Sequence, residues 1–395
     1  MALRIRPRKL WIRITSILAL CVGVMWWMGR DVTPPPPAEE PKPPTPVSAS
    51  MNNLFFGNVF WGRYTHDWSQ ASTLKYEFPF DGLHDFEREK YTAWIAGLEC
   101  PTAAGSDPTS AQQEATLSFN CRPEYLPEAA KWFSVFTLAN NHTDNEGAAG
   151  FTETKQRLDE NGIQYFGHYD PTLTSEACEV IALPADIAYS DGSLRRQSLP
   201  VAMCGFHGVY QIPPTATIEE MNKYSPYMPV LAFPHMGAEY VAEPDQIKTT
   251  AYRLMIDNGA DVVLGDHPHW IQSTESYKGR LIVYSMGNFI FDQQGVPELV
   301  RSAAINVKMD VQDDAALAEW LQVGEACNEF KDSCLEVAAE QNMSKLDYTY
   351  QFDVIGTNND NKRVRLATPA ELNNILLRLR WHTTMQQLQS PYTTI

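Results

Sequence analysis

The stretch Val262-Val263-Leu264-Gly265-Asp266-His267-Pro268-His269 carries an apolar run directly into a loop with two histidines. The apolar run has the length and composition of a buried β-strand. Two histidines that flank one residue can both reach a single metal centre from a tight loop, and neutral imidazole suits zinc, iron, nickel or manganese. Such triplets also occur by chance in surface loops, so the meaning of this one depends on the other strand ends of the chain.

Other short apolar runs of the sequence also end in polar residues that can bind metal. Ligands of α/β proteins bind beyond the carboxyl ends of strands, so converging loops of this kind build one site from distant parts of a sequence. The runs are 54–56 before Gly57-Asn58, 92–95 before Gly97-Leu98-Glu99, 135–138 before Asn140-Asn141-His142, 230–233 before His235, and 281–284 before Ser285, Gly287 and Asn288.

Amphipathic helical patterns lie between some of these runs. The segment 150–161 is followed by Gly162, and the segment 244–258 is followed by Gly259. A glycine in this position is typical of the left-handed residue that ends a helix. Strands that alternate with helices predict an α/β fold.

The C-terminal part, residues 294–395, shows no pattern that indicates chemistry. It contains strand-like runs at 302–311 and 348–355 and helical patterns at 317–343 and 369–388. We expect this extension to complete or cover the sheet formed by the preceding residues.

The composition and the net charge of the chain indicate which ligands it is unsuited to bind. The chain has 395 residues, an apolar fraction of 44% and a formal net charge of −17. The charge argues against nucleic-acid binding, which needs a basic patch. It also argues against a deep, strongly basic groove for a polyanion, although it leaves room for local basic spots.

The N-terminus is the exception to this acidity. Residues 1–13 carry five basic side chains, and the apolar run 14–28 follows. Counted from Leu10, the apolar stretch approaches the roughly 20 residues that a membrane helix needs. Because a basic flank stays in the cytoplasm, we expect a cytoplasmic segment 1–13, a single transmembrane anchor 14–28 at the cell membrane, and an extracytoplasmic remainder. A cleaved signal peptide is the alternative, but Trp26-Trp27-Met28 are bulkier than a cleavage site requires.

A proline-rich segment follows the predicted anchor. Residues 29–50 contain Pro34-Pro35-Pro36-Pro37 and further prolines. Such segments favour polyproline II and act as semi-rigid spacers. We expect a linker at 29–50 and an ectodomain at 51–395; plain disorder of the linker would leave this topology unchanged.

Six cysteines lie outside the predicted anchor, an even number that fits an oxidising compartment. Proximity in sequence suggests the pairs Cys100–Cys121, Cys178–Cys204 and Cys327–Cys334, although connectivity cannot be deduced from sequence. Reduced, buried thiols are the alternative. The absence of a CxxC pair in the sequence argues against a structural zinc site.

A series of motifs resembles, in order and spacing, the CapA family of capsule (poly-γ-glutamate) synthesis proteins. That family adopts the calcineurin-like metallophosphoesterase fold, and the resemblance covers about residues 52–293. The motifs are Gly57-Asn58-Val59-Phe60-Trp61-Gly62-Arg63, Gly97-Leu98-Glu99, Ala139-Asn140-Asn141-His142, His235-Met236-Gly237-Ala238-Glu239-Tyr240, residues 265–269, and Tyr284-Ser285-Met286-Gly287-Asn288-Phe289.

The resemblance implies a four-layer α/β/β/α sandwich with a site for one or two divalent metal ions of the manganese, zinc or iron type. It implies that Glu99 bridges the two ions. The remaining roles follow from the same likeness: Asn141, His235 and His267 hold one ion, Asn58 and His269 hold the other, His142 acts as general acid, and Arg63 contacts an anionic substrate.

Two departures from the family pattern bear on catalysis. The family usually has Gly-Asp where this chain has Gly57-Asn58, and Asn-Leu-Glu where it has Gly97-Leu98-Glu99. The neutral Asn58 should bind a divalent cation more weakly than an aspartate would. Catalysis that needs two metals is the property that this change affects most, although the Asn58 carbonyl oxygen can still coordinate.

The expected function is therefore a membrane-anchored, extracytoplasmic role in the synthesis, export or anchoring of a capsule or cell-envelope polymer such as poly-γ-glutamate. Expected partners are that polymer, the membrane and a capsule synthase complex. One alternative is a metal-dependent phosphoesterase or amide hydrolase that acts on an envelope polymer. Another is a non-catalytic surface scaffold with a degenerate metal site.

Overall fold

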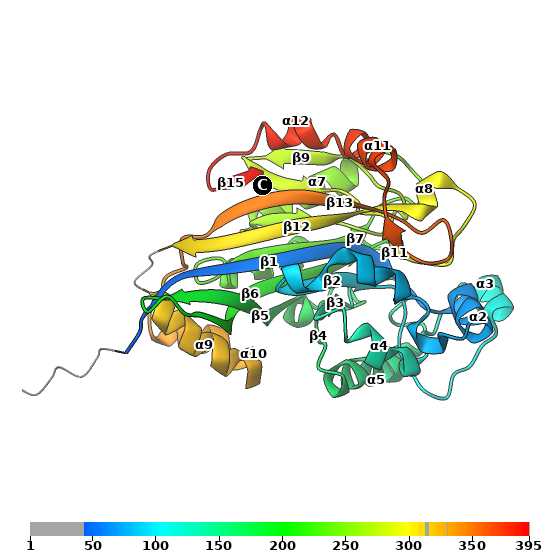
Figure 1. Cartoon of the computed structure of the whole chain (residues 1–395), viewed down its shortest axis with the longest axis horizontal. Helices are drawn as coiled ribbons and strands as arrows, with labels where there is room; N and C mark the ends of the chain where they lie inside the picture. Colours follow the sequence, from blue (N-terminus) through cyan, green and yellow to red (C-terminus); the bar gives the residue numbers. More distant parts are fainter. Residues whose placement is uncertain (1–42, 313–315, 330, 395) are drawn as a thin grey trace, which may run out of the picture. The chain divides into compact units, whose positions relative to one another are not determined.

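β1 (Pro46–Val59) is the strand around which the sheet is built (Figure 1). Its burial alternates over the first residues and becomes continuous from Asn53 to Val59. Alternating burial is typical of a strand covered on one face, and continuous burial is typical of a strand covered on both faces. Residues 46–50 pair antiparallel with β5 (Cys178–Tyr189), and residues 48–55 pair antiparallel with β12 (Arg301–Gln312). Residues 53–59 pair parallel with β2 (Ala93–Leu98), and the strand end also pairs parallel with β11 (Asn288–Ile290).

The computed structural model describes residues 43–312, 316–329 and 331–394, with the backbone alone described within 325–332. The expected cytoplasmic segment 1–13 and anchor 14–28 lie outside the described residues. Within the described part of the chain, no helix is both long enough and apolar enough to cross a membrane.

Three arms of the sheet extend from β1. The first runs through β5, β6 (Leu194–Gly208), β7 (Val230–Met236), β8 (Val262–Leu264), β10 (Arg280–Val283) and β9 (Thr274–Tyr277). The second runs through β12, β13 (Thr349–Asn358) and β14 (Arg365–Leu366), with β15 (Tyr392–Thr394) also paired to β13. The third runs through β2, β3 (Val135–Thr137) and β4 (Gln164–Phe166).

Hydrophobic cores pack on both faces of this sheet. Phe55 belongs to the larger core, whereas its neighbours Leu54 and Phe56 belong to the smaller one. Successive side chains of a strand point to opposite faces, so β1 contributes to both cores at once. The α/β prediction is confirmed, and the extension beyond residue 293 completes the sheet, because β12 pairs directly with β1.

Two expected helices are present. α5 (Gly147–Glu160) is followed by Gly162 at φ 68°, and α7 (Gln246–Asp257) is followed by Gly259 at φ 100°, as the glycine signals predicted. The other α-helices among the described residues are α2 (Arg63–Ala71), α3 (Ser110–Thr116), α4 (Leu126–Ala129), α6 (Thr215–Glu219), α8 (Pro297–Val300), α9 (Leu317–Glu329), α10 (Lys331–Glu340), α11 (Pro369–Leu379) and α12 (Trp381–Met385).

Three expected boundaries differ from the structure. β1 begins at Pro46, so the expected linker 29–50 is too long and its last residues belong to the sheet. Proline is tolerated at the first residue of a strand because its missing N–H is not needed there. β1 also continues through Asn58, and β7 continues through His235. Each residue therefore belongs to the C-terminal end of its strand and not to the loop that follows. Parallel pairing with Gly97 and with His207 extends the two strands this far.

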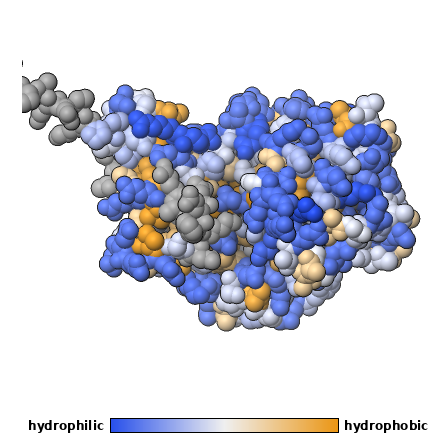
Figure 2. Space-filling model, turned by 90° about the horizontal axis from the view of Figure 1, so that it is seen from below, coloured by the Kyte–Doolittle hydropathy of each residue, from blue (hydrophilic) through white to orange (hydrophobic). Residues whose placement is uncertain are grey.

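Disulfides join two of the three cysteine pairs suggested by proximity, Cys100–Cys121 and Cys178–Cys204. Cys334 is also disulfide-bonded, while the side chain of its expected partner Cys327 lies outside the described residues. The surface seen in Figure 2 is mostly hydrophilic with scattered apolar patches, as expected for an acidic chain with a well-covered core.

The Cys100–Cys121 disulfide should stabilise the loop that follows β2. It closes a loop with a sequence separation of 21, and a loop of this size typically contributes about 3 kcal/mol by restricting the unfolded chain. Replacing both cysteines by alanine should lower the free energy of unfolding by about that amount, measured by denaturant titration of the purified full-length protein. An unchanged unfolding midpoint in the double variant would contradict this.

Candidate metal centre

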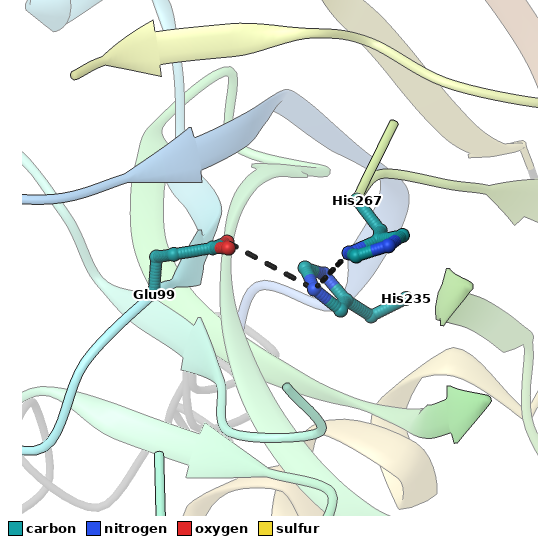
Figure 3. A group of neighbouring side chains, drawn as sticks. All are labelled: Glu99, His235 and His267. Atoms are coloured by element: carbon teal, nitrogen blue, oxygen red, sulfur yellow. Dashed lines mark hydrogen bonds and ion pairs between the residues drawn. The ribbon is translucent and has the colours of Figure 1, made fainter. Parts of the chain in front are cut away.

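Glu99, His235 and His267 meet at one buried point (Figure 3). Glu99 follows β2, His235 lies in β7, and His267 lies in the loop after β8. His267 Nδ1 lies 3.1 Å from His235 Nε2, and Glu99 Oε2 lies 3.9 Å from the same nitrogen. All three side chains are almost fully buried. Parts of the chain 168 residues apart, from 99 to 267, therefore supply one group of ligand atoms.

Asn141 adds an amide oxygen to this group. Its Oδ1 lies 2.8 Å from His235 Nε2. Glu99, Asn141, His235 and His267, the residues expected to share one ion, therefore converge on His235 Nε2. We call these four residues the primary cluster.

Two further side chains orient the primary cluster. Asp266 Oδ1 lies 2.6 Å from His235 Nδ1, a contact that leaves Nε2 of the ring to face the other donors. Metal-binding histidines commonly use a carboxylate in this way. Asn140 Nδ2 donates to Glu99 Oε2 at 2.8 Å. Both residues lie next to expected ligands in the sequence, within motifs that the resemblance singled out, yet their supporting roles depend on contacts across the fold.

Burial disfavours charge throughout the primary cluster. Desolvation raises the pKa of Glu99 to about 7 and lowers the pKa values of His235 and His267 well below the ordinary histidine range. The histidines are therefore neutral at pH 7, the form that binds metal. Glu99 Oε1 has no hydrogen-bond partner within the described part of the chain, so a cation beside Glu99 would offset a buried charge that is otherwise poorly compensated. The donor set fits a divalent metal ion.

The loop that carries the two histidines has an unusual backbone. His267 adopts φ 88° and His269 adopts φ 61°. Residues other than glycine are uncommon in this region, and such conformations persist where the surrounding structure over-determines them, often at functional sites. The backbone here turns both imidazoles toward buried neighbours, but only His267 joins Glu99 and His235 in one group of ligand atoms. That both histidines reach one metal centre stays a prediction.

Asn58 and His269 form a second group beside the first. His269 Nδ1 lies 3.1 Å from the Asn58 amide and 2.8 Å from Asn288 Oδ1. In the amide orientation that satisfies its neighbours, Asn58 donates to Asp266 Oδ2 at 3.0 Å and to Glu99 Oε2 at 3.2 Å. The expected pair is thus brought together, with Asn288 as an additional member to which the resemblance assigned no role.

The pKa of His269 shifts in the opposite direction from those of His235 and His267. Burial alone would lower its pKa, but hydrogen bonding to Glu239, the charge of Glu99 and the contact with Asn288 outweigh burial and raise it. A protonated His269 offers no lone pair, so a cation at this position has to displace a proton.

Arg63 lies away from solvent in a tight ion pair. Its Nε donates to Asp292 Oδ2 at 2.9 Å and its Nη2 donates to Asp292 Oδ1 at 2.6 Å. The guanidinium also lies over the ring of Phe119, 4.6 Å from the centroid. The positive charge expected to meet an anionic substrate is therefore already matched by a buried carboxylate, a partner that sequence analysis missed.

His142 lies in the loop after β3. Its Nδ1 is 3.0 Å from Asn145 Oδ1, and its ring packs against Phe119 with centroids 4.1 Å apart. Burial lowers its pKa to about 4, so the imidazole is neutral at pH 7. Its role as a general acid stays a prediction.

The bacterial capsule synthesis protein PGA_cap family matches residues 53–293, more than half of the 395-residue chain. The chain belongs to this family. The match covers the motif region, including every residue of the primary cluster, and it confirms the resemblance to CapA proteins.

Similar proteins carry related names. PGA biosynthesis protein CapA of Bacillus subtilis is 27% identical over 301 residues, which cover 72% of this chain and 73% of that protein. Capsule biosynthesis protein CapA of Bacillus anthracis is 24% identical over 302 residues, which cover 73% and 69%. A probable polyglutamine synthesis accessory protein of Mycobacterium tuberculosis is 27% identical over 199 residues, which cover 46% and 52%.

The primary cluster predicts a division of roles among the histidines. His267→Ala should remove most of the bound metal, because a ligand of a first coordination sphere has no replacement nearby. His142→Ala should leave the metal in place, and so should His382→Ala, which removes an exposed histidine. Elemental analysis of the purified full-length variants measures metal per chain. Equal metal loss in His267→Ala and His142→Ala would refute this assignment.

Proposed function

We propose that this protein is a membrane-anchored, extracytoplasmic component of capsule synthesis that uses a divalent metal centre in the making, export or anchoring of a poly-γ-glutamate-like polymer. The family match and the names of the relatives support the capsule role. The observation that carries the metal centre is the convergence of Glu99, Asn141 and His267 on His235 Nε2.

The architecture proposed for the ectodomain is the four-layer sandwich of the metallophosphoesterase type. Its support is the packing of hydrophobic cores on both faces of β1, together with the delivery of ligands at the ends of β2, β3, β7 and β8. Ligand delivery of this kind follows the rule that sites in α/β proteins lie beyond the carboxyl ends of strands.

A metal of the manganese, zinc or iron type suits this ligand set, which combines two imidazoles with carboxylate and amide oxygens. Such an ion acts as a Lewis acid that polarises a bound carbonyl or phosphoryl oxygen. Glu99, Asn141, His235 and His267 would hold such an ion, and Asp266 contacts His235 Nδ1, which leaves Nε2 free to face the ion.

Metal-dependent hydrolysis of a phosphoester or an amide is a second candidate function. The carboxylate–imidazole cluster favours it, whereas the lowered pKa of His142 leaves this expected general acid without a proton to donate at pH 7. A scaffold without catalysis is favoured instead by the neutral Asn58 and by the pairing of Arg63 with Asp292. Substrate turnover of γ-glutamyl and phosphodiester compounds by the metal-loaded protein separates the two.

The extracytoplasmic location rests on the basic segment 1–13, the apolar run 14–28 and the disulfides of the folded unit. Protease added to intact cells should therefore degrade the folded part of the chain, detected by immunoblotting. Cleavage only after the cells are permeabilised would contradict the topology.

Asn58→Asp tests the second metal position. The new carboxylate would take the place of the Asn58 amide, whose nitrogen lies 3.0 Å from Asp266 Oδ2 and 3.2 Å from Glu99 Oε2. Like charges at this distance repel in a buried site, so the metal-free variant should melt at a lower temperature, and a bound cation should reverse the loss. We expect metal per chain to rise and the difference in melting temperature between metal-loaded and chelated protein to grow.

Asn373→Asp is the matched control, because it adds the same charge at an exposed position of α11. It should change neither metal content nor the effect of chelation. Unchanged metal content in Asn58→Asp would show that position 58 does not serve a metal. A rise in turnover together with metal would identify the wild type as a weakened hydrolase, whereas metal without turnover would identify a scaffold.

A further inference from the structure

A cavity of about 470 Å³ lies behind the histidine loop. Trp270 and Ile271, which follow His269, form one wall, and residues of α8, the start of β12 and α11 form the others. Figure 1 shows α8 and α11 at the same end of the sheet. The cavity is separate from the primary cluster, none of whose residues lines it.

Arg301 and Arg378 line this cavity without a partner. Within the described part of the chain, neither side chain makes an ion pair or a hydrogen bond, and Arg301 Nε is buried without an acceptor. All the other arginines that the structure describes donate to a carboxylate or to a backbone carbonyl. In a chain with a net charge of −17, two uncompensated guanidinium groups in one cavity are a local exception.

Trp270 adds a third free donor. Its Nε1–H is buried and has no acceptor among the residues that the structure describes. Buried donors are nearly always hydrogen-bonded, so an unpaired one calls for a missing acceptor. Glu298 also lines the cavity, but it forms no ion pair with either arginine in the described structure. The two arginines therefore lack acceptors within the described structure, and a ligand with anionic oxygens would supply them.

The rest of the lining is apolar. Ile271, Ile375 and Leu377 contribute to it, and Leu377 is 66% exposed although it is a large hydrophobic side chain. A suitable ligand would combine methylene groups with carboxylates. A γ-glutamyl chain has this chemistry, because each residue places two methylene groups in the backbone and one free carboxylate beside them.

We propose that this cavity binds carboxylates of a γ-glutamyl chain through Arg301 and Arg378, with the methylene groups on the apolar wall to which the Trp270 side chain belongs. This inference rests on the proposed function for the choice of polymer. Guanidinium groups hold carboxylates in paired, charge-assisted hydrogen bonds. Since the protein as a whole repels a polyanion, such local donors are what allow an acidic chain to bind beside the histidine loop.

The test is the binding of a fluorescently labelled γ-glutamyl oligomer to the purified full-length protein, followed by fluorescence anisotropy. Arg378→Gln and Arg301→Gln should each weaken binding about tenfold or more, the size expected for loss of a charge-assisted hydrogen bond. Arg195→Gln is the matched control: it removes the same charge from an exposed arginine of β6 that pairs with Asp191. It should bind like the wild type. Arg378 lies on a helix surface, so its variant should fold even if Arg301→Gln does not.

A second readout follows Trp270, whose side chain lines the cavity. The indole N–H signal of Trp270, assigned in a ¹H–¹⁵N spectrum by its loss in Trp270→Phe, should shift when the oligomer is added and should stay in place with a neutral γ-glutaminyl oligomer. Binding that persists unchanged in both arginine variants, with no shift of this signal, would overturn the cavity assignment while leaving the polymer role intact.

Two outcomes separate this inference from the proposed function. Wild-type protein treated with a chelator should bind the oligomer as the untreated protein does, because no residue of the primary cluster lines the cavity; loss of binding on chelation would overturn the separation of the two sites. If inorganic phosphate shifts the Trp270 signal and the oligomer neither shifts it nor binds, the ligand class is wrong, and the polymer part of the proposed function fails with it.

Discussion

The parallel pairing of β1 with β2 and β11 is the constraint on which the candidate site depends. It brings Asn58 beside Gly97 and Asn288 in register, so three motifs from distant parts of the sequence meet at one strand end. The approach is so close that a Cβ atom on Gly57 would lie 2.0 Å from the carbonyl oxygen of Gly287. Only glycine permits this contact, and without it β11 could not place Asn288 against His269.

The same packing buries charged groups that a protein interior ordinarily excludes. Glu99, Asp266 and Lys248 are almost fully buried. Desolvation lowers the pKa of Lys248 to about 7, although the charge of Asp266 acts in the opposite direction, and desolvation raises the pKa of Asp266 to about 8. Such groups destabilise a fold unless they are compensated. Their concentration around His235 indicates that this region is shaped for binding, and that the large cores on either face of β1 supply its stability.

The sequence predicted the site best where the signal was local. His267 and His269 share one loop, and Glu99 and Asn141 follow apolar runs, so each could be recognised from a strand and its next few residues. The pairing of Arg63 with Asp292 spans 229 positions, and no spacing rule predicts it. The same holds for Asp266, which is adjacent to an expected ligand but acts on His235 from another strand. The hairpin of β5 and β6 was also not predicted from the sequence.

The departures from the family pattern at positions 58 and 97 are related, because both positions lie against the carboxylate of Asp266. A Cβ atom on Gly97 would lie 2.2 Å from Asp266 Oδ2, so any larger residue at position 97 would compete with this carboxylate for space. The same oxygen lies 3.0 Å from the Asn58 amide in its satisfied orientation. An aspartate at position 58 would face Asp266 and Glu99 as a third carboxylate, whereas asparagine donates a hydrogen bond to both. The small residue at 97, the neutral amide at 58 and the buried Asp266 are therefore mutually consistent. The region keeps two carboxylates, Glu99 within the primary cluster and Asp266 beside it, even though one aspartate of the family pattern is absent.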